Sequence, residues 1–530
     1  MLFNSYVFLC GFLPVALAGF FLCGRLGRDA ALLWLIGASA VFYAWWRPLN
    51  AVLIAPSILI NFVLARALLR YREAQPRAAQ ALLIGGICFN VCFLGYFKYR
   101  NFFLGVAGDV AGIHPVLTHL ILPLGISFIT FQKIAFLIDV QAGRVTRFSL
   151  RDYALFVLFF PQLVAGPIVH YREMMPQFHA ARCRFNGQDV AVGITLFCAG
   201  LFKKGVLADG IAVYVSPIYA AAAGGGHPAF IDGWIAAMGY TLQIYFDFSG
   251  YTDMALGLAR LFGIVLPPNF DSPLRATSII DFWLRWHISL TRFLTAYIYN
   301  PLTLTLTRRR LAQGKRALGR NADLSAFVTL LAFPTMLTMA VSGFWHGAGY
   351  TFVIWGLMHG AFITLNHGWR FVRPRIFPTT AAYERVSAPF GFALTFAAVV
   401  VAMVMFRAET AASAWRIWQG MSGTNGVSLP RAIMAHAPWL ASLGVQADFA
   451  GGKTVLMALA WIAVLLAIAW GSPNTMRLLA DYGPALGIRP KDRRGPAWRP
   501  GAAWAIGLGV VGAIGFLSLG QLSEFLYWQF

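Results

Sequence analysis

Charged residues are scarce in this sequence. Only 12% of its 530 residues are Asp, Glu, Lys or Arg, and 59% are hydrophobic, whereas soluble domains carry about 25% charged and about 45–50% apolar residues. This shortage excludes a soluble globular protein. Long apolar runs recur along most of the chain, from 5–24 to 501–519. At about 20 residues per crossing, they predict an all-α integral membrane protein with about 11–13 membrane segments.

Acidic residues are the scarcest of the charged ones. The chain has 20 Asp and Glu against 42 Lys and Arg, which gives a net charge of +22. The basic residues fall in short runs between apolar segments, such as 66–77, 308–320, 370–375 and 489–499. Nucleic-acid binding could explain such runs, but the excess of Lys and Arg in cytoplasmic loops explains them more simply. We therefore expect no nucleic-acid partner and place these loops in the cytoplasm.

Cysteine and the common catalytic motifs are also sparse or missing. Five of the six cysteines lie within apolar runs, and their spacing matches neither a disulfide framework nor a zinc site. The sequence has no Walker A loop, GxSxG elbow, HExxH pair or dinucleotide fingerprint. These absences argue against nucleotide hydrolysis, serine-hydrolase chemistry and zincin chemistry. No metal site and no prosthetic group are expected.

The middle of the chain differs from its ends. From about 121 to 366, polar residues, Gly and Pro interrupt the apolar segments. Interrupted helices at membrane depth need protein neighbours or water to satisfy their backbone groups, so this region is expected to line a central tunnel with interrupted and re-entrant helices. We expect N-terminal packing helices at 1–110, a core at 111–370 and C-terminal helices at 371–530. The weakly charged connection at about 408–452 should form an amphipathic cap on the outer face.

Ionisable residues within these segments are costly and mark a pathway or site by default. Several have structural explanations. Lys203 and Lys204 are expected to extend toward an interface. Asp247 and Asp253, beside Ser249 and Gly250, are expected to cap a break in a helix, with cation binding or a proton relay as the alternative. The other candidates are Lys133, Asp139, Asp209, Asp281, Arg285, His287, His346 and His359.

The histidines carry the chemical hypothesis. His346 stands in FWHGAG, where glycines leave room for a ligand or chain. On a continuous helix, His359 would lie about 20 Å from it, so we expect His359 to be a packing or tunnel-lining residue. His287, in DFWLRWHISL, is the better partner. Two neutral imidazoles lining one cavity suit removal of a proton from a hydroxyl, because the ordinary pKa of histidine lies near 6.5.

Six stretches in order carry a resemblance to a known family. The chain resembles the membrane-bound O-acyltransferases, in the bacterial branch that serves alginate O-acetylation, peptidoglycan O-acetylation and teichoic-acid D-alanyl transfer. The stretches are LPLGISFITFQKIAFLIDV (122–140), FFPQLVAGPIVHYREMMPQF (159–178), GLFKKGVLAD (200–209), LQIYFDFSGYTDMALGLARLFGIVLPPNF (242–270), DFWLRWHISLTRFLTAYIYNPL (281–302) and FWHGAGYTFVIWGLMHG (344–360).

The resemblance implies a helical bundle around a tunnel and acyl transfer from a thioester donor, acetyl-CoA. The family's near-invariant histidine falls on His346, and its second site residue falls on His287. One departure concerns the donor entrance. The branch's Arg-Asp pair is replaced by Thr295 and Ala296, and its Pro-Leu-Gly-Gly turn reads Pro-Leu-Thr-Leu at 301–304.

The expected function follows from this resemblance. An acetyl group from cytoplasmic acetyl-CoA would cross a bacterial inner membrane for O-acetylation of an extracytoplasmic polysaccharide, alginate or a similar exopolysaccharide. A periplasmic SGNH-type acetyltransferase partner would complete delivery. Peptidoglycan O-acetylation is the first alternative, and a multi-pass glycan or ion-coupled transporter is the alternative from another class.

Each candidate residue has an expected role. His346 would deprotonate the acceptor hydroxyl, and His287 would orient or polarise the thioester. Trp286 and Trp345 should exclude water and pack the pantetheine arm of the donor, and Arg285 is a third substrate-binding candidate. The cofactor-binding candidates should attract the phosphates of the donor: Arg308, Arg309 and Arg310.

Overall fold

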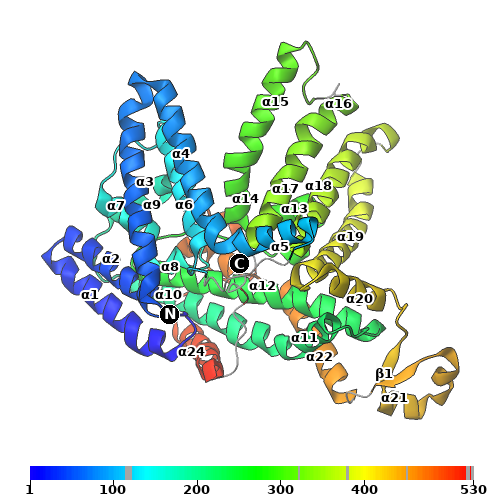
Figure 1. Ribbon diagram of the computed structural model, residues 1–530. Helices are drawn as coiled ribbons and strands as arrows, with labels where there is room; N and C mark the ends of the chain where they lie inside the picture. Colours follow the sequence, from blue (N-terminus) through cyan, green and yellow to red (C-terminus); the bar gives the residue numbers. More distant parts are fainter. Residues whose placement is uncertain are drawn as a thin grey trace. The chain divides into compact units, whose positions relative to one another are not determined.

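Helices make up most of the described chain (Figure 1). The structure is a computed structural model that describes residues 1–113, 122–319, 323–377, 381–448, 452–493, 495–520 and 526. Within these ranges, the strands form one parallel pair of three residues each, β1 (Ser428–Pro430) and β2 (Gln446–Asp448), and turns and irregular segments connect the helices. The predicted all-α class is confirmed.

Eight helical stretches of the described chain are long and apolar enough to cross a membrane. They are Val7–Leu26, Pro48–Ala74, Pro76–Ala111, Gly187–Ala223, Leu324–His346, Arg385–Arg407, Thr454–Tyr482 and Ala502–Gly520. The apolar runs predicted about 11–13 segments. The difference arises partly because α2 (Arg28–Ala44) has only 17 residues, and because α12 (Phe230–Leu261) and α18 (Tyr350–Ile376) mix polar with apolar residues.

The chain packs into two compact units, each built from separated segments. Unit 1 comprises Met1–Phe202, Gly250–Pro268 and Thr475–Gln521. Besides α2 and the end of α12, its helices are η1 (Val7–Phe12), α1 (Leu13–Leu26), α3 (Pro48–Ala74), α4 (Pro76–Leu94), η2 (Gly95–Tyr99), α5 (Arg100–Ala111), α6 (Ile126–Gln141), α7 (Leu150–Leu158), α8 (Phe160–Leu163), α9 (Tyr171–Ala180), α10 (Gly187–Phe202), α23 (Thr475–Leu478), η8 (Ala480–Tyr482), η9 (Pro490–Asp492), α24 (Ala502–Leu517) and η10 (Ser518–Gly520).

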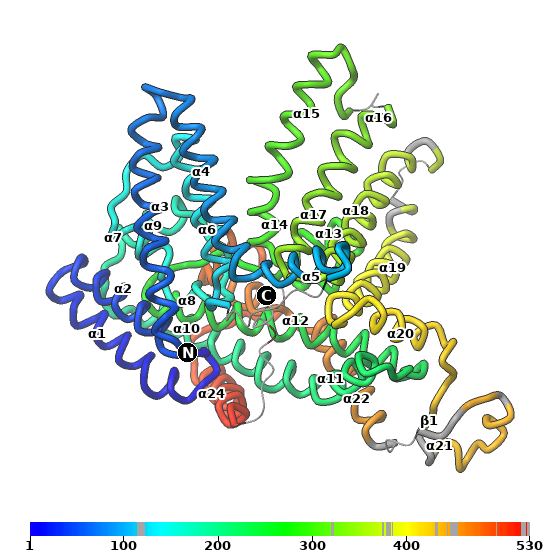
Figure 2. The backbone as a smooth tube through the Cα atoms, viewed as in Figure 1, coloured from blue at the N-terminus to red at the C-terminus, as the bar shows by residue number. Residues whose placement is uncertain are grey.

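Within unit 1, α1 and α2 form an antiparallel pair, and α3, α4 and α6 pack side by side (Figure 2). Buried amides join α3 to α4, because Asn90 donates through Nδ2 to Asn61 at 2.6 Å. Lys133 of α6 is buried and donates to Ser57 of α3 at 2.6 Å. These polar contacts satisfy groups that would be costly to leave alone in an apolar interior.

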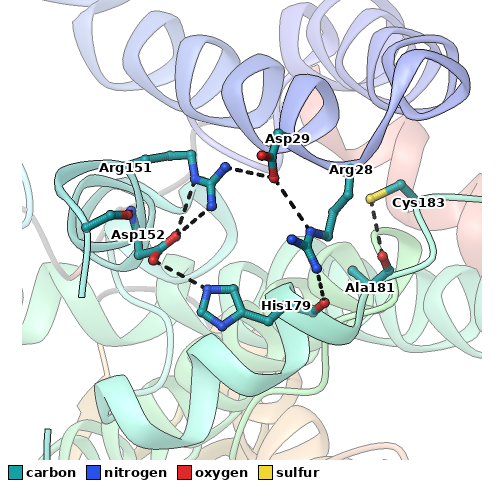
Figure 3. Close-up of polar contacts among 8 residues, drawn as sticks. Arg28, Asp29, Arg151, Asp152, His179, Ala181 and Cys183 are labelled. Carbon is teal, nitrogen blue, oxygen red and sulfur yellow. Dashed lines mark hydrogen bonds and ion pairs between the residues drawn. The ribbon is translucent and has the colours of Figure 1, made fainter. Parts of the chain in front are cut away.

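A polar cluster ties distant parts of unit 1 together (Figure 3). Arg151 lies 2.7 Å from Asp29 at the start of α2 and 3.3 Å from Asp152. His179 of α9 lies 3.4 Å from Asp152. Arg28 donates to the carbonyl of His179 at 2.6 Å. The start of α2, the start of α7 and the end of α9 therefore share one network.

Unit 2 comprises Lys203–Ser249, Asn269–Asn474 and Leu522–Phe530. Besides the first part of α12, α18 and the two strands, its helices are η3 (Lys203–Ala208), α11 (Asp209–Ala223), η4 (Pro273–Arg275), α13 (Ile279–Arg285), α14 (Ile288–Leu294), η5 (Thr295–Tyr299), α15 (Asn300–Ala312), α16 (Leu324–Phe327), η6 (Val328–Ala332), α17 (Phe333–His346), α19 (Ala381–Arg407), α20 (Ala411–Met421), α21 (Arg431–His436), η7 (Pro438–Leu443) and α22 (Gly452–Gly471).

Glycines set the closest helix pair of unit 2, α17 and α18, which lie side by side in Figure 1. A Cβ added at Gly343 would overlap the carbonyl oxygen of Phe352, and one at Gly356 would overlap the carbonyl oxygen of Met339. A Cβ at Gly356 would also lie 3.1 Å from the Cα of Gly343. These two glycines therefore provide clearance between the two helices.

The segment predicted as a cap at 408–452 folds as α20, β1, α21, η7 and β2 over its described residues, while 449–451 lie outside them. Thr410 caps α20 through a reciprocal pair of hydrogen bonds with Ser413. Asn425 donates to the carbonyl of Pro228, so this segment packs on the turn between α11 and α12. Which side of the membrane it faces stays a prediction.

Two structural interpretations of ionisable residues are wrong. α12 is continuous from Phe230 to Leu261, so Asp247 and Asp253 cap no helix break. Asp253 instead accepts a hydrogen bond from Thr475 at 2.8 Å. Lys204 does not reach an interface. It is buried and forms ion pairs with Asp209, at 2.8 Å, and with Asp247. A buried ammonium needs such partners because desolvation penalises an isolated charge.

Candidate functional site

His287 occupies the turn between α13 and α14 in an uncommon backbone conformation. Its φ of 43° and ψ of 51° lie in the left-handed region, which residues other than glycine rarely adopt. The turn is held because the backbone N–H of Ile288 donates to the carbonyl of Asn269 at 3.0 Å. Strain of this kind, roughly 1–3 kcal/mol, persists only where surrounding contacts impose it, and it concentrates at functional positions.

Asn269 fixes the tautomer of the His287 ring. The Oδ1 of this buried amide accepts from the backbone N–H of Ser289 at 3.1 Å and from the Ser289 hydroxyl at 2.7 Å. A backbone N–H can only donate, so the atom facing it must be the amide oxygen. That same oxygen lies 3.2 Å from Nδ1 of His287. Nδ1 therefore carries the proton, and Nε2 presents a lone pair.

His346 lies at the point where one helix ends and the next begins. It is the last residue of α17. Gly347 and Gly349 then follow in extended conformations, and α18 starts at Tyr350. Its side chain is buried, at 8% exposure, among the rings of Trp345, Trp355 and Phe406, with centroids 4.9, 5.3 and 5.2 Å away.

The structure brings the two predicted site histidines together. The ring centroids of His287 and His346 lie 6.1 Å apart, at an interplanar angle of 56°. Trp345 contacts both rings, with its centroid 6.1 Å from His287 and 4.9 Å from His346. Phe248 packs edge-on against His287 at 4.7 Å. The pair is therefore enclosed by aromatic rings and shielded from bulk water.

The premise that separated His359 from His346 is wrong. Because the chain breaks at 347–349, the two residues do not lie on one continuous helix. Both rings contact Trp355, whose centroid is 5.3 Å from His346 and 4.9 Å from His359. His359 is fully buried, as a packing residue would be, but a single indole separates it from the candidate catalytic pair.

Two of the substrate-binding candidates make contacts that hold α13. Trp286 stacks on Phe282 with centroids 5.5 Å apart and packs edge-on against Phe270 at 5.1 Å. Arg285 forms an ion pair with Asp281 at 2.8 Å. These contacts hold α13 in place, so both residues support the turn that carries His287. The third candidate, Trp345, contacts the rings of both histidines.

The three arginines predicted to bind the cofactor differ in their exposure to solvent. Arg308 and Arg309 are exposed near the end of α15. Arg310 is buried and donates to the hydroxyls of Ser325 and Thr329 at 2.9 and 3.0 Å. Arg310 therefore ties α15 to α16 and η6, and only its two neighbours present exposed guanidinium groups. Arg320, at the end of the predicted basic loop, lies outside the described residues.

The sequence did not single out the residues that orient the pair. Asn269 lay in one of the quoted stretches, after two prolines, and a buried amide in an apolar segment is the signal that could have found it. Trp355 and Phe406 looked like ordinary apolar residues. Their contacts with His346 depend on how α17, α18 and α19 pack.

Comparisons with known proteins identify the family of this chain. The family model described as MBOAT, membrane-bound O-acyltransferase family, matches residues 86–318, which include His287 and end before His346. A peptidoglycan O-acetyltransferase of Helicobacter pylori is 39% identical over 458 residues, covering 81% of each chain. A probable alginate O-acetylase of Pseudomonas aeruginosa is 39% identical over 79% of this chain and 75% of its own. A teichoic acid D-alanyltransferase of Streptococcus thermophilus is 28% identical over 46% of this chain and 57% of its own.

Proposed function

Because this chain belongs to the membrane-bound O-acyltransferase family, we propose that it takes an acetyl group from acetyl-CoA and passes it on for O-acetylation of an extracytoplasmic polysaccharide. The family makes it an acyltransferase and a multi-pass membrane protein. Donor, acceptor and direction of transfer are the proposed part. The proposed location is the bacterial inner membrane, where cytoplasmic acetyl-CoA meets the inner face.

One observation carries the proposed chemistry: the rings of His287 and His346 are 6.1 Å apart in an aromatic enclosure. A hydroxyl oxygen between two such rings is within reach of a nitrogen of either. Removal of its proton lets the oxygen attack the thioester carbonyl, form the new ester bond and expel the thiolate, which takes up a proton. Exclusion of water protects the thioester from hydrolysis.

The tautomer of His287 changes the expected division of roles. Polarising a carbonyl needs an N–H, but the contact with Asn269 leaves a lone pair at Nε2 of the neutral ring. We therefore keep His346 as the proposed general base and assign His287 to proton acceptance instead of thioester polarisation. Two acceptors in one enclosure can share the proton that leaves the hydroxyl.

The donor is proposed to approach from the end of α15. Arg308 and Arg309 are exposed there, and guanidinium groups recognise phosphates through paired hydrogen bonds. α17 begins near this end, because η6 directly precedes it and packs against α15. Its 14 residues span about 20 Å to His346. A donor bound by its phosphates at the arginines would have to extend a long arm to reach the histidines.

Two acceptors are supported by similar proteins. A relative named as a probable alginate O-acetylase and one named as a peptidoglycan O-acetyltransferase are each 39% identical to this chain. An exopolysaccharide such as alginate is the first candidate, and peptidoglycan is the second. A periplasmic SGNH-type acetyltransferase remains the proposed partner for delivery. Between enzyme and transporter, the family assignment favours the enzyme.

Acetyl-CoA labelled in the acetyl group tests this proposal in proteoliposomes. The reconstituted protein should release CoA and transfer label to added alginate-type oligosaccharide or peptidoglycan strands, alone or with the partner. His346→Ala should lower the rate at least 100-fold, whereas the exposed His227→Ala should match the unchanged protein. If the thioester stays intact with every acceptor and partner tested, the proposal is wrong and a transporter is the better interpretation.

A further inference from the structure

Three exposed arginines of unit 1 have no partner within the described chain. Arg25 lies in the last turn of α1, and Arg182 and Arg184 lie in the connection between α9 and α10. Among the described residues, none accepts a hydrogen bond from their guanidinium groups or forms an ion pair with them. The proposed acyl transfer uses none of the three, so their charge is available to a ligand.

The two segments that carry these arginines pack against each other within unit 1. Three contacts pair them in order: Phe21 with Phe185, Gly24 with Cys183, and Arg28 with His179. In the first contact the ring centroids are 6.3 Å apart, and in the second a Cβ on the glycine would overlap the partner's carbonyl oxygen. In the third, drawn in Figure 3, the guanidinium donates to a carbonyl at 2.6 Å.

These contacts gather the arginines into one group. Residue numbers rise along one segment and fall along the other, so the two segments run antiparallel. Arg25 and Arg182 both fall between the second and third contacts, and Arg184 falls between the first and second. Three like charges from two segments therefore lie within one short stretch of contacts.

The acidic residues of these segments already have basic partners. Positions 21–29 and 179–189 contain one acidic residue each, Asp29 and Asp189. Asp29 lies 2.7 Å from Arg151 (Figure 3), and Asp189 lies 2.8 Å from Arg260. Neither carboxylate forms an ion pair with the three arginines, so the charge of the group is not compensated within the described chain.

Arginines gathered in this way repel one another. Water and salt screen the repulsion, but the screening is weaker beside hydrocarbon, where the effective dielectric constant is lower. An anion that contacts more than one of the guanidinium groups removes this cost. Phosphate suits this position because a guanidinium group binds its oxygens through paired hydrogen bonds.

The group lies where two candidate membrane spans end. Val7–Leu26 finishes just after Arg25, and Gly187–Ala223 begins three residues after Arg184. Large apolar side chains beside the arginines are exposed, at 84% for Leu26 and 71% for Phe185. Basic and aromatic residues at the ends of spans lie at the depth of lipid headgroups. A soluble anion would contact the arginines but would leave these apolar side chains uncovered.

We propose that Arg25, Arg182 and Arg184 bind the phosphate of an anionic phospholipid, whose acyl chains pack against Leu26 and Phe185. The uncompensated charge of the group favours a headgroup with a net negative charge over a zwitterionic one. The bound lipid joins the end of α1 to the connection that precedes α10. This inference does not depend on the proposed acyl transfer.

Lipid binding to the full-length protein tests this proposal. The protein in detergent is titrated with phosphatidylglycerol, or with phosphatidylcholine of the same acyl chains, and bound lipid is counted by native mass spectrometry. Phosphatidylglycerol should bind at least 5-fold more tightly than phosphatidylcholine. It should also raise the melting temperature more, because a ligand that binds only the folded state stabilises that state.

Variants that each remove one charge locate the site. Arg25→Gln, Arg182→Gln and Arg184→Gln should each weaken phosphatidylglycerol binding about 5-fold, the usual contribution of one basic residue near an anionic membrane surface. Arg385→Gln is the matched control, because it removes an exposed arginine at the start of a candidate span in unit 2. This control should bind the lipid as the unchanged protein does. Melting temperatures without added lipid show whether each variant is folded.

Two measurements test the contribution of the acyl chains. Glycerophosphoglycerol, the soluble headgroup without its chains, should bind at least 10-fold more weakly than the lipid. Phe185→Ser retains the three arginines but removes the apolar contact, so it should weaken phosphatidylglycerol binding.

The opposite results would overturn the proposal. Equal affinity for phosphatidylglycerol and phosphatidylcholine would show that the arginines form no site for anionic lipid. If Arg385→Gln weakens binding as much as Arg182→Gln, the attraction is a general effect of net charge. If glycerophosphoglycerol binds as tightly as the lipid, or if Phe185→Ser retains full affinity, the ligand is a soluble phosphate ester. None of these measurements involves acyl transfer, so failure here leaves the proposed function standing.

Discussion

At the scale of single residues, the arrangement around His287 decides what the site can do. A histidine in this turn could present either a donor or an acceptor to the enclosure. The Oδ1 of Asn269 accepts from the backbone N–H of Ser289 and faces Nδ1 of His287, so Nδ1 carries the proton and Nε2 of His287 presents a lone pair. The chemical role of His287 therefore depends on a residue 18 positions upstream.

Replacing Asn269 tests this role. Asn269→Ala should lower kcat for acetyl transfer roughly 10–100-fold with a smaller change in KM, because the imidazole loses the partner that fixes its tautomer. Asn269→Asp keeps an oxygen that accepts from His287 and Ser289, so it should retain more activity than Asn269→Ala. Equal kcat in all three proteins, at matched melting temperature, would contradict the assigned tautomer.

The residue scale also shows what sequence reasoning could reach. His287 and His346 were predicted from residue type and from family resemblance, and the structure places their rings 6.1 Å apart. Their catalytic roles stay predictions. Asn269 and Trp355 were missed because their contribution is a contact, and the sequence carries no direct record of contacts between separate helices. His359 was set aside because a continuous helix was assumed.

At the scale of elements, the break between α17 and α18 shapes the site. Gly347 and Gly349 are extended, so the chain turns sharply and α18 packs back on α17. Gly343 and Gly356 let the two backbones approach closely. This approach carries Trp355 and His359 toward His346. If α17 and α18 formed one continuous helix, His346 and His359 would be about 20 Å apart, as the sequence first suggested.

A larger side chain where α17 contacts α18 should therefore disturb the site, although it does not touch the histidine pair. Gly356→Ala places a Cβ against the carbonyl of Met339, so it should destabilise the protein by about 1–3 kcal/mol and lower acetyl transfer. Gly349→Ala is the matched control, because its Cβ would meet Phe352 at an ordinary 3.6 Å. Thermal unfolding in detergent measures the first effect and labelled acetyl transfer the second. Equal behaviour of the two variants would contradict the close contact.

At the scale of the whole molecule, each unit carries its own polar network. In unit 2, Lys204 is buried between Asp209 and Asp247. In unit 1, the network of Figure 3 joins three segments outside the eight candidate spans. Burial acts to raise the pKa of Asp152, but hydrogen bonds to Ser149 and His179 and the charges of His179 and Arg151 outweigh it, so this pKa lies below its ordinary value.

This lowered pKa gives a pH dependence of stability. A carboxyl group whose folded pKa is depressed stabilises the fold above its unfolded pKa, about 3.9, and loses that contribution as pH falls through the folded value. Asp152→Asn should thus be less stable than the unchanged protein at pH 7, by about 0.5–1 kcal/mol, since its charged partners are partly exposed. The difference should shrink below about pH 4. A gap in melting temperature that stays constant from pH 7 to pH 3 would rule this out.

The sequence by itself determined the class of this protein. A shortage of charge and long apolar runs leave no soluble alternative, and helices are the only structure that satisfies the backbone of such segments individually. The six stretches led to the family. The tertiary structure decided which residues act together. Helix breaks, glycine contacts and buried hydrogen bonds determine which side chains meet, and they arise from packing between segments that lie far apart in the sequence.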